Sequence, residues 1–183
     1  MIMRKVCRLI LLSVAFGSVF AGLAMAQDSG AGEYEIKAAF LLNFARFAQW
    51  PPTALGDAPR PIVIGIVGED PFDPQILDGL GRKSVDGRPL VIRHFKDGRD
   101  LDGCHILFVG AMKDKDLQAI LEAASKKNIL TVGDNAGFMS AGGMIRFLAK
   151  GDKIRFEVSP MRVESASIKL SAKLMGVAII VRQ

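Results

Sequence analysis

The sequence has few of the side chains on which metal sites and covalent catalysis depend. Its 183 residues include two cysteines, two histidines, one tryptophan and one tyrosine. The histidines His94 and His105 are too few to form a metal site without carboxylates. The acids Asp70, Asp73 and Asp78 lack the spacing of a calcium-binding loop. We therefore expect no metal ion and no cofactor.

Groups for nucleophilic catalysis are equally scattered. Cys104 and His105 are adjacent, but neighbours on an extended strand point to opposite faces of the sheet. Ser140 has no base near it in the sequence, and there is no G-x-S-x-G motif. Asp134 follows a predicted strand, where active-site acids often lie, yet an Asp-Asn pair is also common in turns. We expect a protein that is not an enzyme, with a hydrolase that uses Asp134 as the weaker alternative.

A glycine-rich stretch at 131–147, TVGDNAGFMSAGGMIRF, could be mistaken for a phosphate-binding loop. It has no lysine, so it is not a Walker loop, and its glycine spacing does not match a dinucleotide fingerprint. A predicted strand follows it, whereas a phosphate site needs the N-terminus of a helix. The glycines therefore indicate sharp turns.

The first 26 residues have the layout of a secretory signal peptide. Arg4, Lys5 and Arg8 precede an apolar run over 9–20, which is shorter than the roughly 20 residues of a membrane-spanning helix. Ala24-Met25-Ala26 then supplies a cleavage site. We expect residues 1–26 to be removed and residues 27–183 to form one exported domain; a retained membrane anchor is the alternative.

The charge of the chain argues against a nucleic-acid partner. The formal net charge is +5, but the three basic residues of the signal peptide leave the mature chain near +2. A nucleic-acid binder would need a concentrated basic face, whereas clusters such as Lys113-Asp114-Lys115-Asp116 alternate in sign.

Cys104 is left alone once Cys7 is removed with the signal peptide, so the mature chain cannot form an internal disulfide. It lies in the apolar run CHILFV, which favours burial. A disulfide between two molecules is the alternative, and Cys104 is the redox candidate.

Residues 34–50 predict a helix that is apolar on most of its circumference. Ile36, Phe40, Phe44 and Phe47 form its inward stripe, while Lys37, Asn43, Arg46 and Gln49 form a narrow solvent side. Pro51-Pro52 ends the helix. Trp50, at its end, either fills the core or lines a pocket for a small molecule or a partner.

The following segments alternate between strand and helix, as in an α/β sheet with helical layers. Strands are predicted over 61–67, 90–95, 105–109 and 129–132, and helices over 72–80 and 116–127. The segments 144–149 and 153–158 form a hairpin around Gly151-Asp152. This turn places Phe147 opposite Phe156, and Arg146 opposite Glu157 as an ion pair. An extended piece over 168–170 leads to a helix from about Ser171, whose packing stripe is Leu174, Val177, Ala178 and Val181.

The predicted fold is therefore a single α/β domain. Its mixed sheet has about five to six strands, including the C-terminal hairpin, and helices flank both faces.

The mature chain resembles the YfiR-like (YfiR/HmsC-like) family of periplasmic regulatory proteins. Several short segments carry the resemblance in order along nearly the whole chain. They are EIKAAFLLNFARFAQWP at 35–51, IVGEDPF at 66–72, CHILFV at 104–109, LTVGD at 130–134, GF at 137–138, GGMI at 142–145, RFEV at 155–158 and LSAKL at 170–174.

The resemblance implies a mixed sheet with flanking helices and no enzymatic activity. It also implies a periplasmic negative regulator that binds the sensor domain of an inner-membrane diguanylate cyclase, or of another membrane signalling protein such as a sensor kinase. Repression of cyclic-di-GMP production and biofilm formation would end under envelope or redox stress, or on capture by an outer-membrane lipoprotein. We expect a homodimer.

Two departures from the family pattern concern the site residues. The protein that gives the family its name carries two cysteine pairs; here Cys104 matches one position, its partner aligns near Gly65, and the second pair is absent. The family's ligand pocket maps near Gln49, Trp50, Lys169 and Ser171, which match it in part. The alternative function is a periplasmic small-molecule binding module, with Trp50 as an aromatic wall and Lys169 pairing with an anion.

Overall fold

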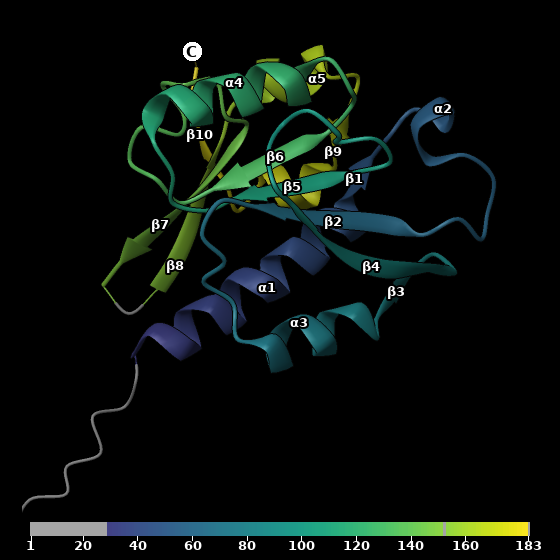
Figure 1. Ribbon diagram of the computed structural model, residues 1–183, viewed down its shortest axis with the longest axis horizontal. Helices are drawn as coiled ribbons and strands as arrows, with labels where there is room; N and C mark the ends of the chain where they lie inside the picture. Colours follow the sequence, from purple (N-terminus) through teal and green to yellow (C-terminus); the bar gives the residue numbers. More distant parts are fainter. Residues whose placement is uncertain (1–28, 152, 183) are drawn as a thin grey trace, which may run out of the picture.

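The computed structural model describes residues 29–151 and 153–182, and it shows a mixed β-sheet with helices on both faces (Figure 1). This confirms the predicted α/β class. The predicted signal peptide, residues 1–26, lies outside the described residues, and so does Asp152 of the hairpin turn.

The main sheet has eight strands in the order β10-β8-β7-β6-β5-β2-β4-β3. The five neighbours from β7 to β4 are parallel, β8 and β3 run antiparallel to their neighbours β7 and β4, and β10 is parallel to β8. A separate two-stranded sheet pairs β1 with β9. The strands are β1 Ala48–Gln49, β2 Ile62–Val67, β3 Ser84–Val85, β4 Arg88–Phe95, β5 Ile106–Val109, β6 Leu130–Gly133, β7 Ile145–Lys150, β8 Lys153–Val158, β9 Lys169–Leu170 and β10 Ile179–Ile180.

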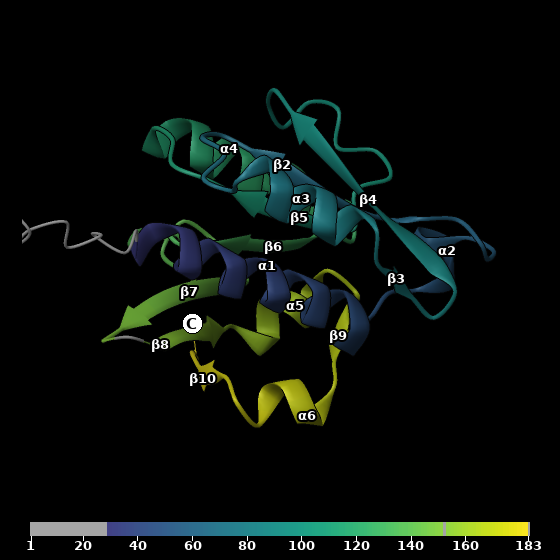
Figure 2. The same cartoon turned by 90° about the horizontal axis from the view of Figure 1, so that it is seen from below.

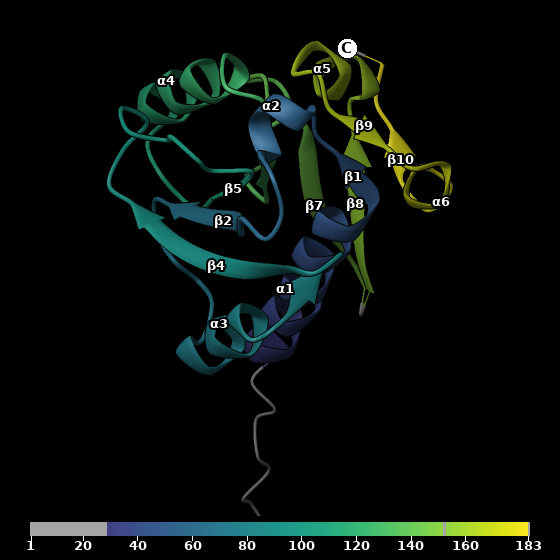
Figure 3. The ribbon, with the colours of Figure 1, turned by 90° about the vertical axis from the view of Figure 1, so that its right-hand side faces the viewer.

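Helices cover the sheet because its central strands are apolar on both faces. All residues of β2, β5 and β6 are buried. One face packs against α1 and α3, and the other against α4 (Figures 1 and 3). The helices are α1 Ser29–Phe47, α2 Pro52–Leu55, α3 Pro74–Gly81, α4 Asp114–Ser125, α5 Pro160–Ser165 and α6 Ala172–Met175.

The predicted hairpin is confirmed in its register. Phe147 pairs with Phe156, and Arg146 pairs with Glu157, whose carboxylate lies 2.7 Å from the guanidinium. Gly151 adopts a φ of 58°, which favours glycine in the turn. Phe40 and Phe44 of α1 pack on the two hairpin phenylalanines with ring centroids 5.3 to 5.9 Å apart. These four rings join the first helix to the sheet.

The predicted faces of the first helix are partly wrong. Ile36 was expected to face the core, but 44 % of it is exposed, whereas Lys37 was expected in solvent and is 2 % exposed. The helix also ends at Phe47, earlier than predicted, because Ala48–Gln49 forms strand β1. Pairing with β9 offers these two residues interstrand hydrogen bonds.

The predicted C-terminal helix is also wrong beyond its first turn. The helix α6 ends at Met175, and Val177 is 58 % exposed instead of packed. Ile179–Ile180 forms β10, which pairs with β8 along the edge of the sheet (Figure 2). The open edge of β8 therefore competes with helix formation for this β-branched segment.

Candidate functional site

The junction of β1 and β9 brings together three of the four predicted site residues. Gln49 pairs directly with Lys169, and both side chains are exposed. Ser171 follows at once; its backbone N–H donates to the carbonyl of Phe47 over 2.9 Å, and its hydroxyl accepts a bond from Leu174 N–H. A polar surface is thus built where the first helix ends and the last helix begins.

Trp50, the fourth predicted site residue, lies in the core. It is 7 % exposed, and its ring packs edge-on against the imidazole of His105 with centroids 6.0 Å apart. Its indole N–H is buried and has no acceptor within the described part of the chain. The structure thus agrees with the first of the two interpretations of Trp50.

His105 and Cys104 serve separate contacts. The imidazole Nδ1 accepts a hydrogen bond from Val63 N–H over 3.0 Å, so Nε2 carries the proton toward the carbonyl of Ala54 at 3.3 Å. Burial lowers the pKa of His105, which keeps the ring neutral. The imidazole of His105 therefore connects strand β2 to helix α2 through two hydrogen bonds.

Cys104 is buried, as predicted, at 5 % exposure. Its thiol donates to the carbonyl of Ile106 over 3.2 Å, and burial raises the pKa of the thiol to about 12. Because the thiolate is the reactive form, this cysteine is inert in the folded chain. A Cβ placed on Gly65 would lie 2.8 Å from the Cys104 sulfur and 2.6 Å from the Phe95 ring.

The glycine-rich stretch after β6 wraps an aromatic ring. A Cβ on Gly133 would lie 2.6 Å from the ring of Phe138, and one on Gly143 would lie 2.2 Å from it. Gly142 has a φ of 108°, which other residues rarely adopt. The glycines thus allow close packing and a sharp turn, in agreement with the prediction.

Asp134, the candidate catalytic acid, belongs to a polar cluster that sequence reasoning missed. Its carboxylate lies 2.6 Å from Lys37 Nζ and accepts a hydrogen bond from the Tyr34 hydroxyl over 3.1 Å. Lys37 also bonds Glu33 at 2.5 Å and lies 4.2 Å from the centre of the Tyr34 ring. The one clue to this cluster in the sequence was Lys37 itself, a charged residue in a helix that is apolar on most of its circumference.

The contacts within this cluster favour the charged form of Lys37 and the neutral form of Tyr34. Burial opposes the charged form of Lys37, but the bonds to Asp134 and Glu33 outweigh it and raise the lysine pKa. Burial and the neighbouring Asp134 raise the pKa of Tyr34 as well. A lysine held in its ammonium form is a hydrogen-bond donor and cannot act as a base. The cluster therefore ties α1 to the loop that follows β6.

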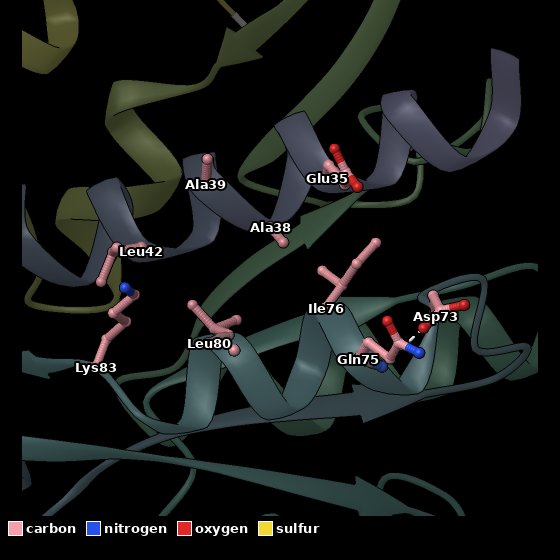
Figure 4. A pocket seen from close by; sticks show the side chains of 10 residues that line it. Glu35, Ala38, Ala39, Leu42, Asp73, Gln75, Ile76, Leu80 and Lys83 are labelled. Carbon is pink, nitrogen blue, oxygen red and sulfur yellow. Dashed lines mark hydrogen bonds between the residues drawn. The ribbon is translucent and has the colours of Figure 1, made fainter.

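A groove of about 550 Å³ runs between α1 and α3 (Figure 4). Small and apolar side chains, among them Ala38 and Ile76, form its walls. Glu35 and Asp73 lie toward one end and Lys83 at the other (Figure 4). The groove has the size of a small-molecule site, but it bears few convergent polar groups.

Large apolar side chains are exposed near the C-terminal edge of the sheet. We refer to Met161, Val177, Ile179 and Ile180, which are 62 %, 58 %, 41 % and 44 % exposed, as the C-terminal apolar cluster, although the strand neighbours Ile179 and Ile180 point to opposite faces. Met161 and Ile180 border the same hollow. Exposed apolar side chains that lie together, as Met161 and Ile180 do, are typical of protein contacts.

Within residues 29–151 and 153–182, no group of three or more His, Cys, Asp or Glu side chains is placed to hold a metal ion. Among the helices that the structure describes, none combines the length and apolar character needed to span a membrane.

These features define an α/β domain whose buried polar groups serve the fold and whose accessible apolar surface suits contacts with other molecules. The chain matches the YfiR/HmsC-like family over residues 34–179 and belongs to that family. The family is one of periplasmic regulators of cyclic-di-GMP signalling, and it is regulatory and not catalytic. A comparison with curated proteins finds no match.

Proposed function

We propose that the mature chain is a periplasmic negative regulator. It binds the periplasmic sensor domain of an inner-membrane diguanylate cyclase and holds the enzyme in its inactive arrangement, which lowers cyclic-di-GMP and biofilm formation. The observation that carries the proposal is the family match over residues 34–179. A membrane sensor kinase is the other candidate for the bound partner, and an outer-membrane lipoprotein is a candidate for its release.

The C-terminal apolar cluster supports the proposal as the contact surface. Val177 and Ile180 are exposed apolar side chains beside an edge strand, so a partner that covers them gains hydrophobic free energy. Repression requires that the sensor domain exposes a matching surface in its inactive state, because a bound protein shifts an equilibrium only by its difference in affinity. The same cluster is a candidate surface for the expected homodimer.

The test is co-expression of the full chain with a membrane diguanylate cyclase that has a periplasmic sensor domain, with cellular cyclic-di-GMP as the measurement. The variants Val177→Asp and Ile180→Asp should relieve repression and abolish co-purification from detergent. Ile36→Asp is the matched control, since Ile36 and Ile180 are each 44 % exposed. Equal repression by all variants, with unchanged thermal melting, would rule out the cluster. A wild-type chain that does not lower cyclic-di-GMP would rule out the regulator.

The alternative is a small-molecule binding module, which the pairing of Gln49 with Lys169 favours. An anionic ligand at this junction would lie close to Trp50, the single tryptophan, and would shift its fluorescence. Loss of such a shift in Lys169→Ala, but not in Lys173→Ala, would support the module. If no metabolite shifts the fluorescence and the protein represses the cyclase, small-molecule binding is excluded as the main function.

A further inference from the structure

The outer edge of β4 is open over its second half. Strand β3 pairs with β4 only at Ser84–Pro89 and Val85–Arg88, and the N–H of Leu90 donates to Lys83 over 3.0 Å. Backbone groups alternate in direction along a strand, so those of residues 92 and 94 also point outward. Within the described residues, no strand lies there to pair with them.

A hollow lies directly beside this open edge. It has a volume of about 780 Å³ and is bounded by β4 and by α3, which lies beneath β4 in Figure 3. Leu77, Leu90 and Ile92 give it apolar walls. It is also lined by Asp78, by Arg82 and by His94, whose Nε2 lies 2.7 Å from Asp70. An open strand edge beside an apolar hollow supplies backbone bonds for affinity and a pocket for selectivity.

We propose that this edge binds an extended segment of another protein as an added β-strand. The backbone N–H and C=O groups of Ile92 and His94 would bond the incoming strand. Side chains of the strand opposite these two residues point toward α3, because paired residues share a face of the sheet. An apolar side chain at that position fills the hollow beside Ile92.

Charge identifies the kind of segment. Arg93 lies between the two open residues, is exposed, and points to the opposite face of the sheet. Its guanidinium lies 4.8 Å from the centre of the Phe95 ring and donates to the carbonyl of Asp102 over 3.2 Å, without a carboxylate partner among the described residues. An acidic side chain opposite Arg93 would complete an ion pair, so the segment has an apolar–acidic–apolar pattern.

The same residue argues against a second copy of the chain as the occupant. Two β4 edges that pair through Ile92 and His94 place Arg93 directly opposite Arg93. Like charges in that position destabilise a sheet. The β4 edge and the C-terminal apolar cluster lie at opposite edges of the sheet. Binding of a segment at β4 therefore does not depend on the membrane partner proposed above.

The experiment uses a display library of random octapeptides, selected on the full mature chain. Selected peptides should carry the apolar–acidic–apolar pattern and slow the amide exchange of residues 92 and 94. His94→Pro removes the outward N–H and should weaken binding at least about tenfold, which is about 1.4 kcal/mol. His94→Ala is the matched control, because it removes the imidazole and keeps the N–H.

Arg93→Glu provides a second variant, which leaves the backbone edge intact. It should weaken the acidic peptides about tenfold and favour peptides with a basic residue at the same position. The proposal is overturned if no peptide is enriched, or if His94→Pro and His94→Ala bind equally well while both melt like the wild type. Protection at the C-terminal apolar cluster, or self-association lost in His94→Pro, would also overturn it. None of these outcomes bears on repression of a cyclase.

Discussion

Lys37 and Asp134 are 97 positions apart, yet the lysine Nζ lies 2.6 Å from the aspartate Oδ2. The lysine side chain is 3 % exposed and the carboxylate side chain 20 %. This ion pair joins the middle of the first helix to the carboxyl end of β6, where an α/β enzyme would place a catalytic acid. In this chain the acid has a structural partner instead.

We predict that Asp134→Ala destabilises the fold more than Lys37→Met. The first change leaves a buried ammonium with Glu33 alone. It should cost about 2–4 kcal/mol, somewhat less than the roughly 3–5 kcal/mol of a fully broken buried pair, because Glu33 remains. The second leaves carboxylates that reach solvent, and should cost about 1–2 kcal/mol. Urea unfolding monitored by circular dichroism measures both.

The double variant, with both Lys37→Met and Asp134→Ala, measures the interaction energy between the two side chains. Its cost should be smaller than the sum of the two single changes, because each single change strands the other group. Additive costs would show that the two side chains do not stabilise one another. A turnover that Asp134→Asn abolishes in a stably folded chain would instead revive the hydrolase alternative.

His105 should make the fold sensitive to mild acid. Burial lowers the pKa of this imidazole below its ordinary value of 6.5, so the unfolded chain binds the proton more readily than the folded chain. The resulting stability is complete above about pH 6.5 and is lost as pH falls toward the folded pKa. Protonation also places an N–H against the N–H of Val63. Melting temperatures measured from about pH 7.5 to 5.5 should decline over this window.

His105→Asn tests the assignment, because its side-chain oxygen can accept from Val63 and does not titrate in this range. The variant should start less stable and vary less with pH. His94→Gln is the control for the loss of an imidazole that is 59 % exposed and lies 2.7 Å from Asp70. An unchanged pH dependence in His105→Asn would assign the acid sensitivity to other groups.

Gly65→Cys should form a disulfide with Cys104. The new Cβ lies 2.8 Å from the existing sulfur, close enough for bonding after a small shift of the Phe95 ring. The oxidised variant should be about 3 kcal/mol more stable than the same variant under reduction. Thiol titration in denaturant and melting with and without reductant provide the measurements.

Gly65→Ser carries a side chain of similar size without a second thiol. It should melt below the wild type and show no response to reductant. Two free thiols in a Gly65→Cys sample refolded in the presence of an oxidant would contradict the closeness of residues 65 and 104.

Ser159→Ala should stabilise the fold by about 1 kcal/mol. Ser159 is fully buried, and its hydroxyl has no hydrogen-bond partner within the described residues. Its backbone bonds with Met144 and Val163 do not depend on the side chain. Chemical denaturation measures the change. Ser165→Ala, at an exposed hydroxyl that bonds Arg162, should stay within about 0.5 kcal/mol; a destabilised Ser159→Ala would reveal a partner for that hydroxyl.

Local patterns in the sequence predicted the parts of the fold that local chemistry determines. One turn at Gly151 fixed the pairing of Phe147 with Phe156, because hairpin register follows turn length. The buried strands β2, β5 and β6 were predicted because continuous apolar runs of their length suit parallel sheets.

Tertiary contacts overrode local patterns elsewhere. The helix expected to continue to about residue 181 ends early, because Ile179 and Ile180 form β10 and pair with the edge of β8. Lys37 was placed in solvent because the helix pattern does not show that Asp134 lies beside it. The open edge of β4 could not be predicted either, as it depends on the shortness of β3.

The pairing of β1 with β9 has a consequence for the order of folding. Ala48 pairs with Leu170, so the short strand that follows the first helix has no backbone partner until almost the entire domain is present. Closing so long a loop is slow. A polypeptide threaded through a membrane from its N-terminus would thus have to deliver its final segments before β1 can pair with β9, which delays closure of this small sheet to the far side.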